Sequence, residues 1–243
     1  PCENKRNNMK MRVLVIFLLT FLLSSCGNGG ENWASKDPSA IAVSPNSFDV
    51  AAAWTKLIQT GYTKSFSLNP TQGTCAGTMR HLQSAAEATN ISSQYFYRNT
   101  LVIALNFTNC SDGATHGPVF ETQDNYYSDS YQNTYYGNST TAGYWAVPAV
   151  FPNAAKVGDT GQIGALNLYS DDGTVWVGYE NWSYTIEQDT ASTAVLRITM
   201  TARDVNGDVL VTEYDRYVIY PDNTLSLRTI DMHYPSGFKV YAY

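Results

Sequence analysis

Apolar and polar residues alternate along much of the second half of the chain, and this pattern predicts β-strands. The alternation is clearest in residues 101–108, 175–188 and 194–203. Successive side chains of a strand point to opposite faces of a sheet, so a period of two predicts a strand with one buried face. In residues 175–188 the predicted inner face carries Trp176, Trp182, Tyr184 and Ile186.

Turn sequences separate the predicted strands. The segments Asp171-Asp172-Gly173, Asn206-Gly207 and Pro221-Asp222-Asn223 contain the residues that favour tight turns, and Asn206-Gly207 predicts a two-residue type I′ hairpin. Residues 159–234 therefore predict five consecutive antiparallel strands. Strands of this length twist and curl strongly. We expect an all-β fold, a curved antiparallel meander in the form of a half-barrel, a barrel or a sandwich.

One amphipathic helix is predicted near the start of the β domain, over residues 47–60. Its apolar positions recur at helical spacing and lie on one side: Val50, Trp54, Leu57 and Ile58. Ser47 or Asp49 can cap its first turn, and Gly61 can end it. We expect this helix to pack against the sheet rather than to bind a partner.

The first 25 residues have the pattern of an export signal. Lys10 and Arg12 precede an apolar run at residues 13–23, which is shorter than the roughly 20 residues of a membrane-spanning helix. The run ends in Leu23-Ser24-Ser25-Cys26, which resembles the lipobox of bacterial lipoproteins. That resemblance implies cleavage before Cys26 and attachment of lipid to its sulfur. Two or three acyl chains anchor a protein firmly to a membrane.

The chain accordingly divides into four parts. Residues 1–8 form an upstream extension, 9–25 a lipoprotein signal peptide, 26–46 a flexible tether rich in Gly, Asn, Ser and Pro, and 47–243 the β domain. Lipoproteins retained in the inner membrane typically carry Asp after the lipidated cysteine, where this chain has Gly27. The resemblance thus implies a lipid anchor in the bacterial outer membrane.

Charge excludes one class of partner. Cleavage before Cys26 leaves 11 basic and 20 acidic residues, a net charge of −9. Nucleic acids and anionic lipid headgroups are bound through clustered Lys and Arg, so we expect no nucleic-acid partner. The predicted contact with the membrane is through the lipid on Cys26.

Two cysteines remain after lipidation, Cys75 and Cys110. In an oxidising compartment such a pair most simply forms one disulfide, although two unpaired buried thiols are the alternative. The closed loop of about 35 residues corresponds to roughly 3–4 kcal/mol in the chain-entropy model. No metal site or cofactor is predicted, because none of the three histidines is spaced as a ligand beside a cysteine.

A second resemblance covers roughly the C-terminal third of the chain. The segments Val157-Gly158-Asp159-Thr160-Gly161-Gln162-Ile163-Gly164, Tyr169-Ser170-Asp171 and Glu213-Tyr214-Asp215-Arg216-Tyr217 are similar to those of uncharacterised lipoproteins of Gram-negative bacteria. These motifs consist of turn glycines and strand residues. The resemblance supports the lipoprotein class and implies no site.

No catalytic residue is predicted. Glu213 and Asp215 share one face of a strand and would suit acid–base chemistry in a cleft, but a solvated face or pairing with Arg203 and Arg228 is the preferred interpretation. The Gly-x-Ser-x-Gly motif, which carries the nucleophile of many serine hydrolases, is absent from the sequence. Asp204 begins a sequence similar to a calcium loop, but Gly and Glu are missing from the required positions.

The most unusual segment is residues 125–145, where aromatic rings alternate with amide and hydroxyl side chains. Such platforms suit sugars or a protein partner, although Tyr and Asn also cover the edges of exported β-sheets. The candidate binding surface comprises Tyr126, Tyr127, Tyr131, Tyr135, Tyr136 and Trp145, with Tyr144 beside them.

These observations predict an envelope lipoprotein with a non-enzymatic binding or structural β domain. Its partner is expected to be a glycan, a lipid or another envelope protein. An envelope hydrolase or glycan-processing enzyme is the alternative. Titratable groups with perturbed pKa values that converge in one place would favour the enzyme.

Overall fold

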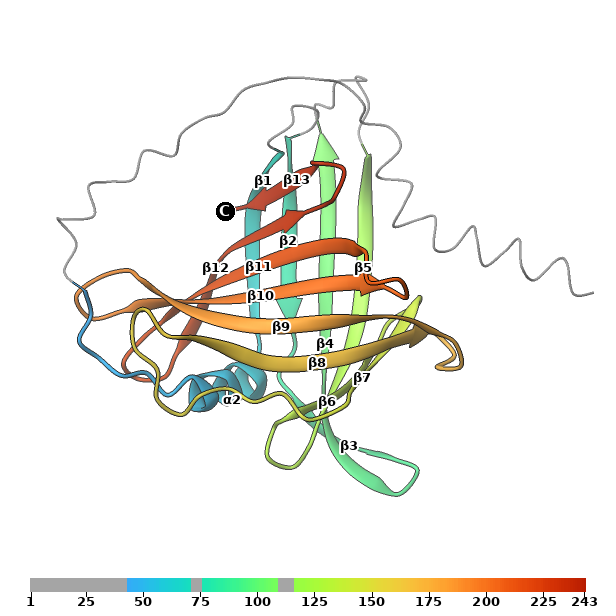
Figure 1. Ribbon diagram of the computed structural model, residues 1–243, viewed down its shortest axis with the longest axis horizontal. Coiled ribbons are helices and arrows are strands. Elements are labelled where there is room, and N and C mark those ends of the chain that lie inside the picture. Colours follow the sequence, from blue (N-terminus) through green and yellow to red (C-terminus); the bar gives the residue numbers. More distant parts are fainter. Residues whose placement is uncertain (1–42, 71–75, 109–115) are drawn as a thin grey trace, which may run out of the picture.

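Twelve strands close into an antiparallel barrel, with a short helix at one end (Figure 1). The computed structural model describes residues 43–70, 76–108 and 116–243. The all-β prediction is confirmed, and the barrel is the observed form of the three that were expected. The predicted signal peptide, Cys26, Cys75 and Cys110 lie outside the described residues.

The described residues contain one helix, α2 (Val50–Thr60), and thirteen strands. The strands are β1 (Tyr62–Pro70), β2 (Ala76–Gln83), β3 (Glu87–Ile91), β4 (Gln94–Thr108), β5 (His116–Tyr127), β6 (Asn133–Gly137), β7 (Thr141–Trp145), β8 (Thr160–Ser170), β9 (Trp176–Gln188), β10 (Ala194–Asp204), β11 (Val209–Ile219), β12 (Leu225–His233) and β13 (Lys239–Ala242).

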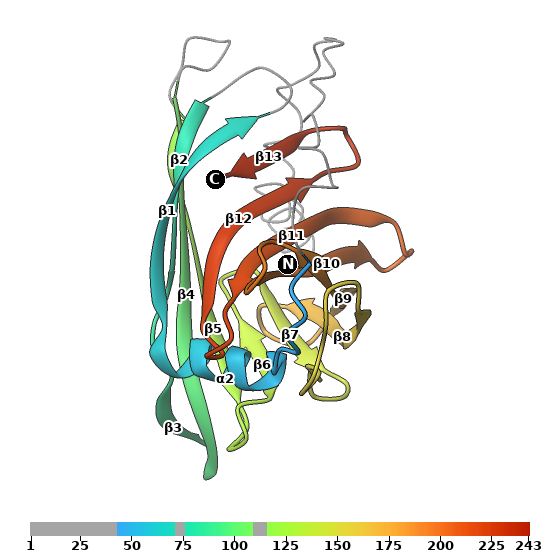
Figure 2. The same ribbon diagram turned by 90° about the vertical axis from the view of Figure 1, so that its left-hand side faces the viewer.

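The barrel closes through two pairings between strands that are distant in sequence. From β4 to β13 each strand pairs with the next, and β1 then pairs with β13 through residues 68–70 and 240–242. β2 pairs with both β1 and β4 and so completes the ring. β3 pairs only with the first part of β4, and the two extend beyond the barrel at the end near α2 (Figures 1 and 2).

Helix α2 lies across the lower end of the barrel in both views (Figures 1 and 2). The Asp49 carboxylate accepts a hydrogen bond from Ala52 N at 2.9 Å, which identifies the N-cap among the two predicted candidates. Gly61, at a φ of 62°, ends the helix and donates its N–H to Leu57 O at 2.9 Å. The predicted helix is confirmed.

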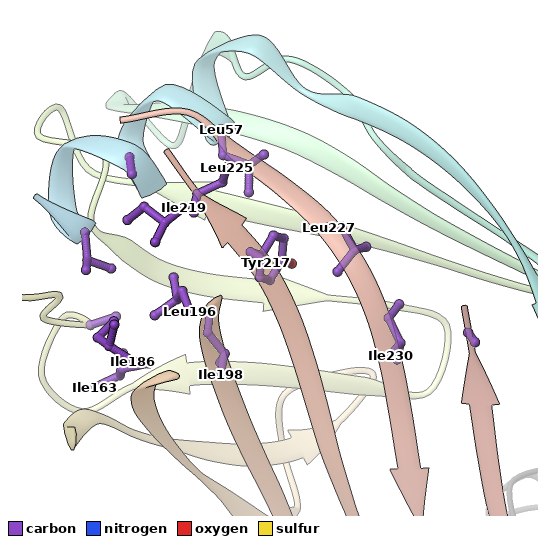
Figure 3. Close-up of a cluster of buried hydrophobic side chains, with 14 of the residues drawn as sticks. Leu57, Ile163, Ile186, Leu196, Ile198, Tyr217, Ile219, Leu225, Leu227 and Ile230 are labelled. Atoms are coloured by element: carbon purple, nitrogen blue, oxygen red, sulfur yellow. The ribbon is translucent and has the colours of Figure 1, made fainter. Parts of the chain in front are cut away.

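The inner face of the barrel near α2 is apolar. Leu196, Ile198 and Ile219 are almost completely buried, and Leu57 packs against them from the helix (Figure 3). The Trp54 ring stacks on Phe151, with centroids 4.8 Å apart. This end of the barrel is therefore a packed core closed by α2.

The outer face of β9 to β12 carries charged pairs. Arg197 lies 2.7 Å from Glu187, and Arg216 pairs with both Glu187 and Asp231. These arginines alternate with the inward apolar residues of β10 and β11, as the period of two predicted. Within the described ranges, no helix is long and apolar enough to cross a membrane.

Two details differ from the sequence expectations. The Asn206-Gly207 turn is not a type I′ hairpin, because Gly207 has a positive φ (87°) and Asn206 does not. Gly207 N–H instead binds Asp204 O at 3.1 Å, in the three-residue loop with a left-handed glycine. The predicted tether ends before residue 46, because Ser44 is buried and the Asn46 side chain donates to Ser192 O at 3.0 Å.

Candidate functional site

The aromatic residues predicted to form one binding surface are divided between the two faces of the barrel wall. Tyr126 and Tyr135 point outward on β5 and β6, while Tyr127, Tyr136 and Trp145 point inward and are buried. The prediction that all six residues form a single binding surface is therefore wrong. The reason is that strand alternation and the turns between β5, β6 and β7 assign neighbouring tyrosines to opposite faces.

The outward rings form an aromatic ladder across five neighbouring strands, β4 to β8. We use this name for Phe96, Tyr126, Tyr135, Tyr144 and Tyr169. Their ring centroids follow one another at 6.3, 5.1, 4.8 and 5.6 Å. The register explains the alignment, because Tyr135 lies directly opposite both Tyr126 and Tyr144. Tyr144 is the most open, with 44% of its surface exposed.

A groove of about 300 Å³ runs along part of the ladder. Its aromatic lining comes from Tyr126 and Tyr135, and its polar lining from Thr122, Asp124 and Asn138. The Asp124 carboxylate accepts a 2.6 Å hydrogen bond from the Thr100 hydroxyl, which fixes its orientation. The groove thus combines aromatic rings with a fixed carboxylate and an amide.

Tyr131 lies in the loop between β5 and β6 rather than in the ladder. Its backbone has a positive φ (58°), and its ring stacks on Tyr97 of β4 with centroids 4.3 Å apart. Burial raises the pKa of Tyr131 above its ordinary value, and the hydroxyl of Tyr97 contributes in the same direction. Tyr131 therefore holds the loop against the projecting part of β4.

Glu213 and Asp215 point into the barrel, so the preferred sequence interpretation of a solvated face is wrong. On β11 they lie opposite Met200 and Ile198 of β10, on the same face as the buried Tyr217. Neither pairs with Arg203 or Arg228. Arg203 donates to Gly207 O, and Arg228 pairs with Asp189.

Two further carboxylates lie on inward faces of the barrel, one from β9, two strands away from β11, and one from β5, farther round the ring. Glu180 of β9 lies opposite Ala202, and Glu121 of β5 lies opposite Ile103, both on inward faces. The charges of Glu121 and Glu180 both raise the pKa of Glu213. We call Glu121, Glu180, Glu213 and Asp215 the interior acidic cluster.

Burial makes all four carboxyl groups harder to ionise. It raises the pKa of Glu213 well above its usual range, and the neighbouring Asp215 charge raises it further. Burial also raises the pKa of Asp215 to about 7, partly offset by hydrogen bonds from Glu213 and Tyr217. The pKa values of Glu180 and Glu121 are raised for the same main reason.

Two carboxylates of the interior acidic cluster accept hydrogen bonds from neighbouring side chains. Glu180 accepts hydrogen bonds from Trp182 Nε1 at 2.9 Å and from the Tyr136 hydroxyl at 3.4 Å. Gly143, opposite Tyr136, leaves room for that ring, since an added Cβ would overlap it. Glu121 accepts from Asn138 Nδ2 at 3.1 Å, and part of the Glu121 residue remains exposed to solvent although burial raises the pKa of its carboxyl. Solvent therefore reaches the cluster beside the turn between β6 and β7.

A hydrogen-bonded pair, the buried His81 and the half-buried Tyr62, lies on β2 and β1. The Tyr62 hydroxyl and His81 Nδ1 are 2.9 Å apart, and their rings are parallel. Burial lowers the pKa of His81 to about 4, so the ring is neutral at pH 7. Tyr62 is within hydrogen-bonding reach of Tyr217, whose hydroxyl lies 3.5 Å from Asp215 Oδ2. Polar side chains thus connect the acidic cluster with β1 and β2.

Within the described residues, no group of three or more His, Cys, Asp or Glu side chains is positioned to hold a metal ion. Sequence reasoning missed the interior acidic cluster as a whole. Its one available signal was that Glu213 and Asp215 share a face with Tyr217 and Ile219, which are core residues.

Comparisons with protein-family models, with curated proteins and with solved structures found no match to the chain.

Proposed function

We infer that this protein is a lipid-anchored envelope lipoprotein whose barrel is a non-enzymatic module that binds neutral glycans on the aromatic ladder. One observation carries the proposal. Five outward rings align across β4 to β8, beside a groove with carboxylate and amide groups. The rings are tilted or edge-to-face relative to one another, at 37° to 81°, and such a row of rings with adjacent hydrogen-bonding groups suits a polar ligand that also has apolar faces.

The chemistry of the groove favours a neutral saccharide. Saccharide C–H groups pack on the rings of Tyr126 and Tyr135, and the hydroxyls donate to the Asp124 carboxylate and accept from an amide. An acidic glycan is disfavoured by the net charge of −9 that remains after cleavage before Cys26, whereas the charge of Asp124 is partly offset by Arg98 at 4.0 Å.

The outer wall of the barrel supports an anchor outside the β domain. Arg197, Arg216 and their carboxylate partners cover the middle of β9 to β12, and such charges are costly at positions that face lipid. The barrel wall is therefore suited to water. We propose that lipid on Cys26 holds it at the outer membrane, with residues 27–43 as the remaining tether.

The test is binding of the full chain to a glycan array and to insoluble neutral polysaccharides. Tyr135→Ala removes the central ring and should weaken binding by up to about tenfold, because an aromatic contact contributes roughly 0.5–1.5 kcal/mol beyond its buried area. Tyr135→Phe keeps the ring and should retain binding. Tyr220→Ala is the matched control, since Tyr220 is 39% exposed and lies outside the ladder.

Two outcomes would contradict the proposal. Absence of binding by the parent chain to every neutral glycan would reject the ligand class. An equal loss in Tyr135→Ala and Tyr220→Ala would show that binding does not depend on the ladder. Thermal melts of all variants separate lost contacts from lost folding.

A hydrolase that acts through Glu213 and Asp215 is the second candidate, because a buried carboxylate pair with raised pKa values suits general acid–base chemistry. The test is hydrolysis of nitrophenyl glycosides and esters by the full chain. Turnover that disappears in Asp215→Asn would support the enzyme, whereas no turnover on any substrate argues against it.

A further inference from the structure

The row of outward aromatic residues continues past the aromatic ladder onto a sixth strand. Trp176 of β9 lies directly opposite Tyr169 in the register, and 44% of its surface is exposed. Residues that lie directly opposite in antiparallel strands share one face of the sheet. The register of β8 and β9 shifts between Leu168 and Tyr169, so Trp176 does not follow the inward alternation of Trp182 and Ile186 that the sequence predicted.

The row is long relative to a small sugar. The strands β4 to β9 are consecutive neighbours in the sheet (Figure 1). Adjacent strands lie about 4.8 Å apart, so six strands span roughly 24 Å. Within the ladder the rings follow one another at 4.8 to 6.3 Å, which makes the row continuous. A monosaccharide or a disaccharide can contact only part of this row, whereas a longer chain can contact all of it.

Hydrogen-bonding groups are concentrated at one place in the row, in the groove beside Tyr126 and Tyr135. Asp124 and Asn138 belong to its polar lining. The Asn138 amide oxygen accepts a hydrogen bond from Thr141 N at 2.8 Å, which fixes the orientation of the amide. The groove therefore offers fixed polar groups to one or two sugar units.

Aromatic side chains lie on both sides of this groove. Phe96 of β4 follows Tyr126 on one side, and Tyr144, Tyr169 and Trp176 follow Tyr135 on the other. Both ends of the row are thus rings, which pack against C–H groups of any sugar unit. A ligand held in the groove can continue in both directions.

We propose that the aromatic ladder and Trp176 bind the middle of an unbranched neutral polysaccharide, which lies extended across β4 to β9. The proposal rests on the proposed function of the ladder as a glycan site and adds the class of glycan. One ring on each strand contacts one chain along its length. Because rings flank the groove on both sides, both ends of the polysaccharide lie outside the site.

Affinity should therefore rise with the length of the chain. Each further sugar unit reaches a further ring, and an aromatic contact corresponds to roughly a two- to tenfold change in affinity. A chain of six units should bind at least tenfold more tightly than a chain of two. Chemical reduction of the terminal sugar should have no effect, because the site contacts internal units.

The test is calorimetric titration of the full chain with cello-oligosaccharides and malto-oligosaccharides of two, four and six glucose units. We expect the hexamer of at least one series to bind at least tenfold more tightly than its dimer, with or without borohydride reduction of its terminal unit. Trp176→Ala should weaken hexamer binding roughly two- to tenfold and leave dimer binding unchanged, because Trp176 is three strands away from Tyr135 of the groove.

Two more variants complete the design. Phe96→Ala removes the ring at the other end of the row and should also weaken hexamer binding. Tyr95→Ala is the matched control, since Tyr95 is the preceding residue of β4, is 48% exposed and lies on the opposite face of the strand. It should bind the hexamer normally. If thermal melts show that Trp176→Ala does not fold, the comparison of Phe96→Ala with Tyr95→Ala decides.

Several results would overturn the proposal. These are equal affinity for dimer and hexamer, loss of hexamer binding on reduction of the terminal sugar, equal losses in Trp176→Ala and Tyr95→Ala, or binding of neither series. Equal affinity for dimer and hexamer that falls in Tyr135→Ala would reject the extended chain and retain the ladder as a glycan site. Unchanged binding in Tyr135→Ala would reject the ladder itself, so the two failures are distinguishable.

Discussion

Replacing Asp215 with asparagine should stabilise the fold above pH 7 and have little effect near pH 4. The pKa of this carboxyl is raised from 3.8 to about 7, mainly by burial. A raised pKa in the folded state means that ionisation costs stability. The contribution of Asp215 is fully present below pH 4 and is lost as the pH rises through 7. This pKa shift corresponds to a loss of at most about 4 kcal/mol in the free energy of unfolding at pH 8, for a residue that is 7% exposed.

Asparagine keeps the shape of the side chain and removes the charge. The pKa of Glu213 should also fall in the variant, because the Asp215 charge is one of the causes that raise it. Urea unfolding of the parent chain and the variant at pH 4.5, 6 and 8 measures the effect. The parent chain should lose stability as the pH rises, and the variant should lose less.

A variant that is equally destabilised at all three pH values would refute this reasoning. That result would mean that hydrogen bonds from Tyr217 and Glu213 matter more than the buried charge. Glu187→Gln serves as the control, since Glu187 forms ion pairs with Arg197 and Arg216 on the outer face. It should show no gain in stability at pH 8.

Three other predictions concern the core, the lipid anchor and the disulfide. Leu57→Ala should cost about 2–5 kcal/mol in urea unfolding because Leu57 is 5% exposed, whereas Lys56→Ala should change stability by less than about 1 kcal/mol. Cys26→Ala should abolish acyl labelling and release the protein from membranes on fractionation; unchanged labelling would argue against the anchor. Non-reducing peptide mapping should recover Cys75 joined to Cys110, and free thiols at both would contradict the disulfide.

Much of the barrel follows from local sequence, but its closure does not. The period of two in residues 194–203 and the turn at residues 221–223 are local signals, and both match the structure. Closure depends on β2 pairing with β4 and on β1 pairing with β13. These contacts depend on the accumulated twist of the whole sheet, so the sequence left the half-barrel, the barrel and the sandwich equally open.

The candidate sites show the same division between local and distant information. The sequence alone can place Glu213 on the inward face, because Glu213 and the core residue Tyr217 lie an even number of positions apart on the same strand. The effect of the Glu121 and Glu180 charges on Glu213 depends on the register of strands as distant in sequence as residue 121 is from residue 213. The tyrosines of residues 125–145 are difficult for another reason, because each intervening turn can reverse which side chains face outward.

The pairing of β1 with β13 has a consequence for how the protein matures. Residues 68–70 must wait for residues 240–242 before the ring can close, so nearly the whole β domain must emerge before the last hydrogen bonds form. Contacts of such long range slow folding and leave unpaired strand edges available for aggregation in the meantime. If the chain is exported, as we propose, we expect a dependence on chaperones that shield these edges during translocation.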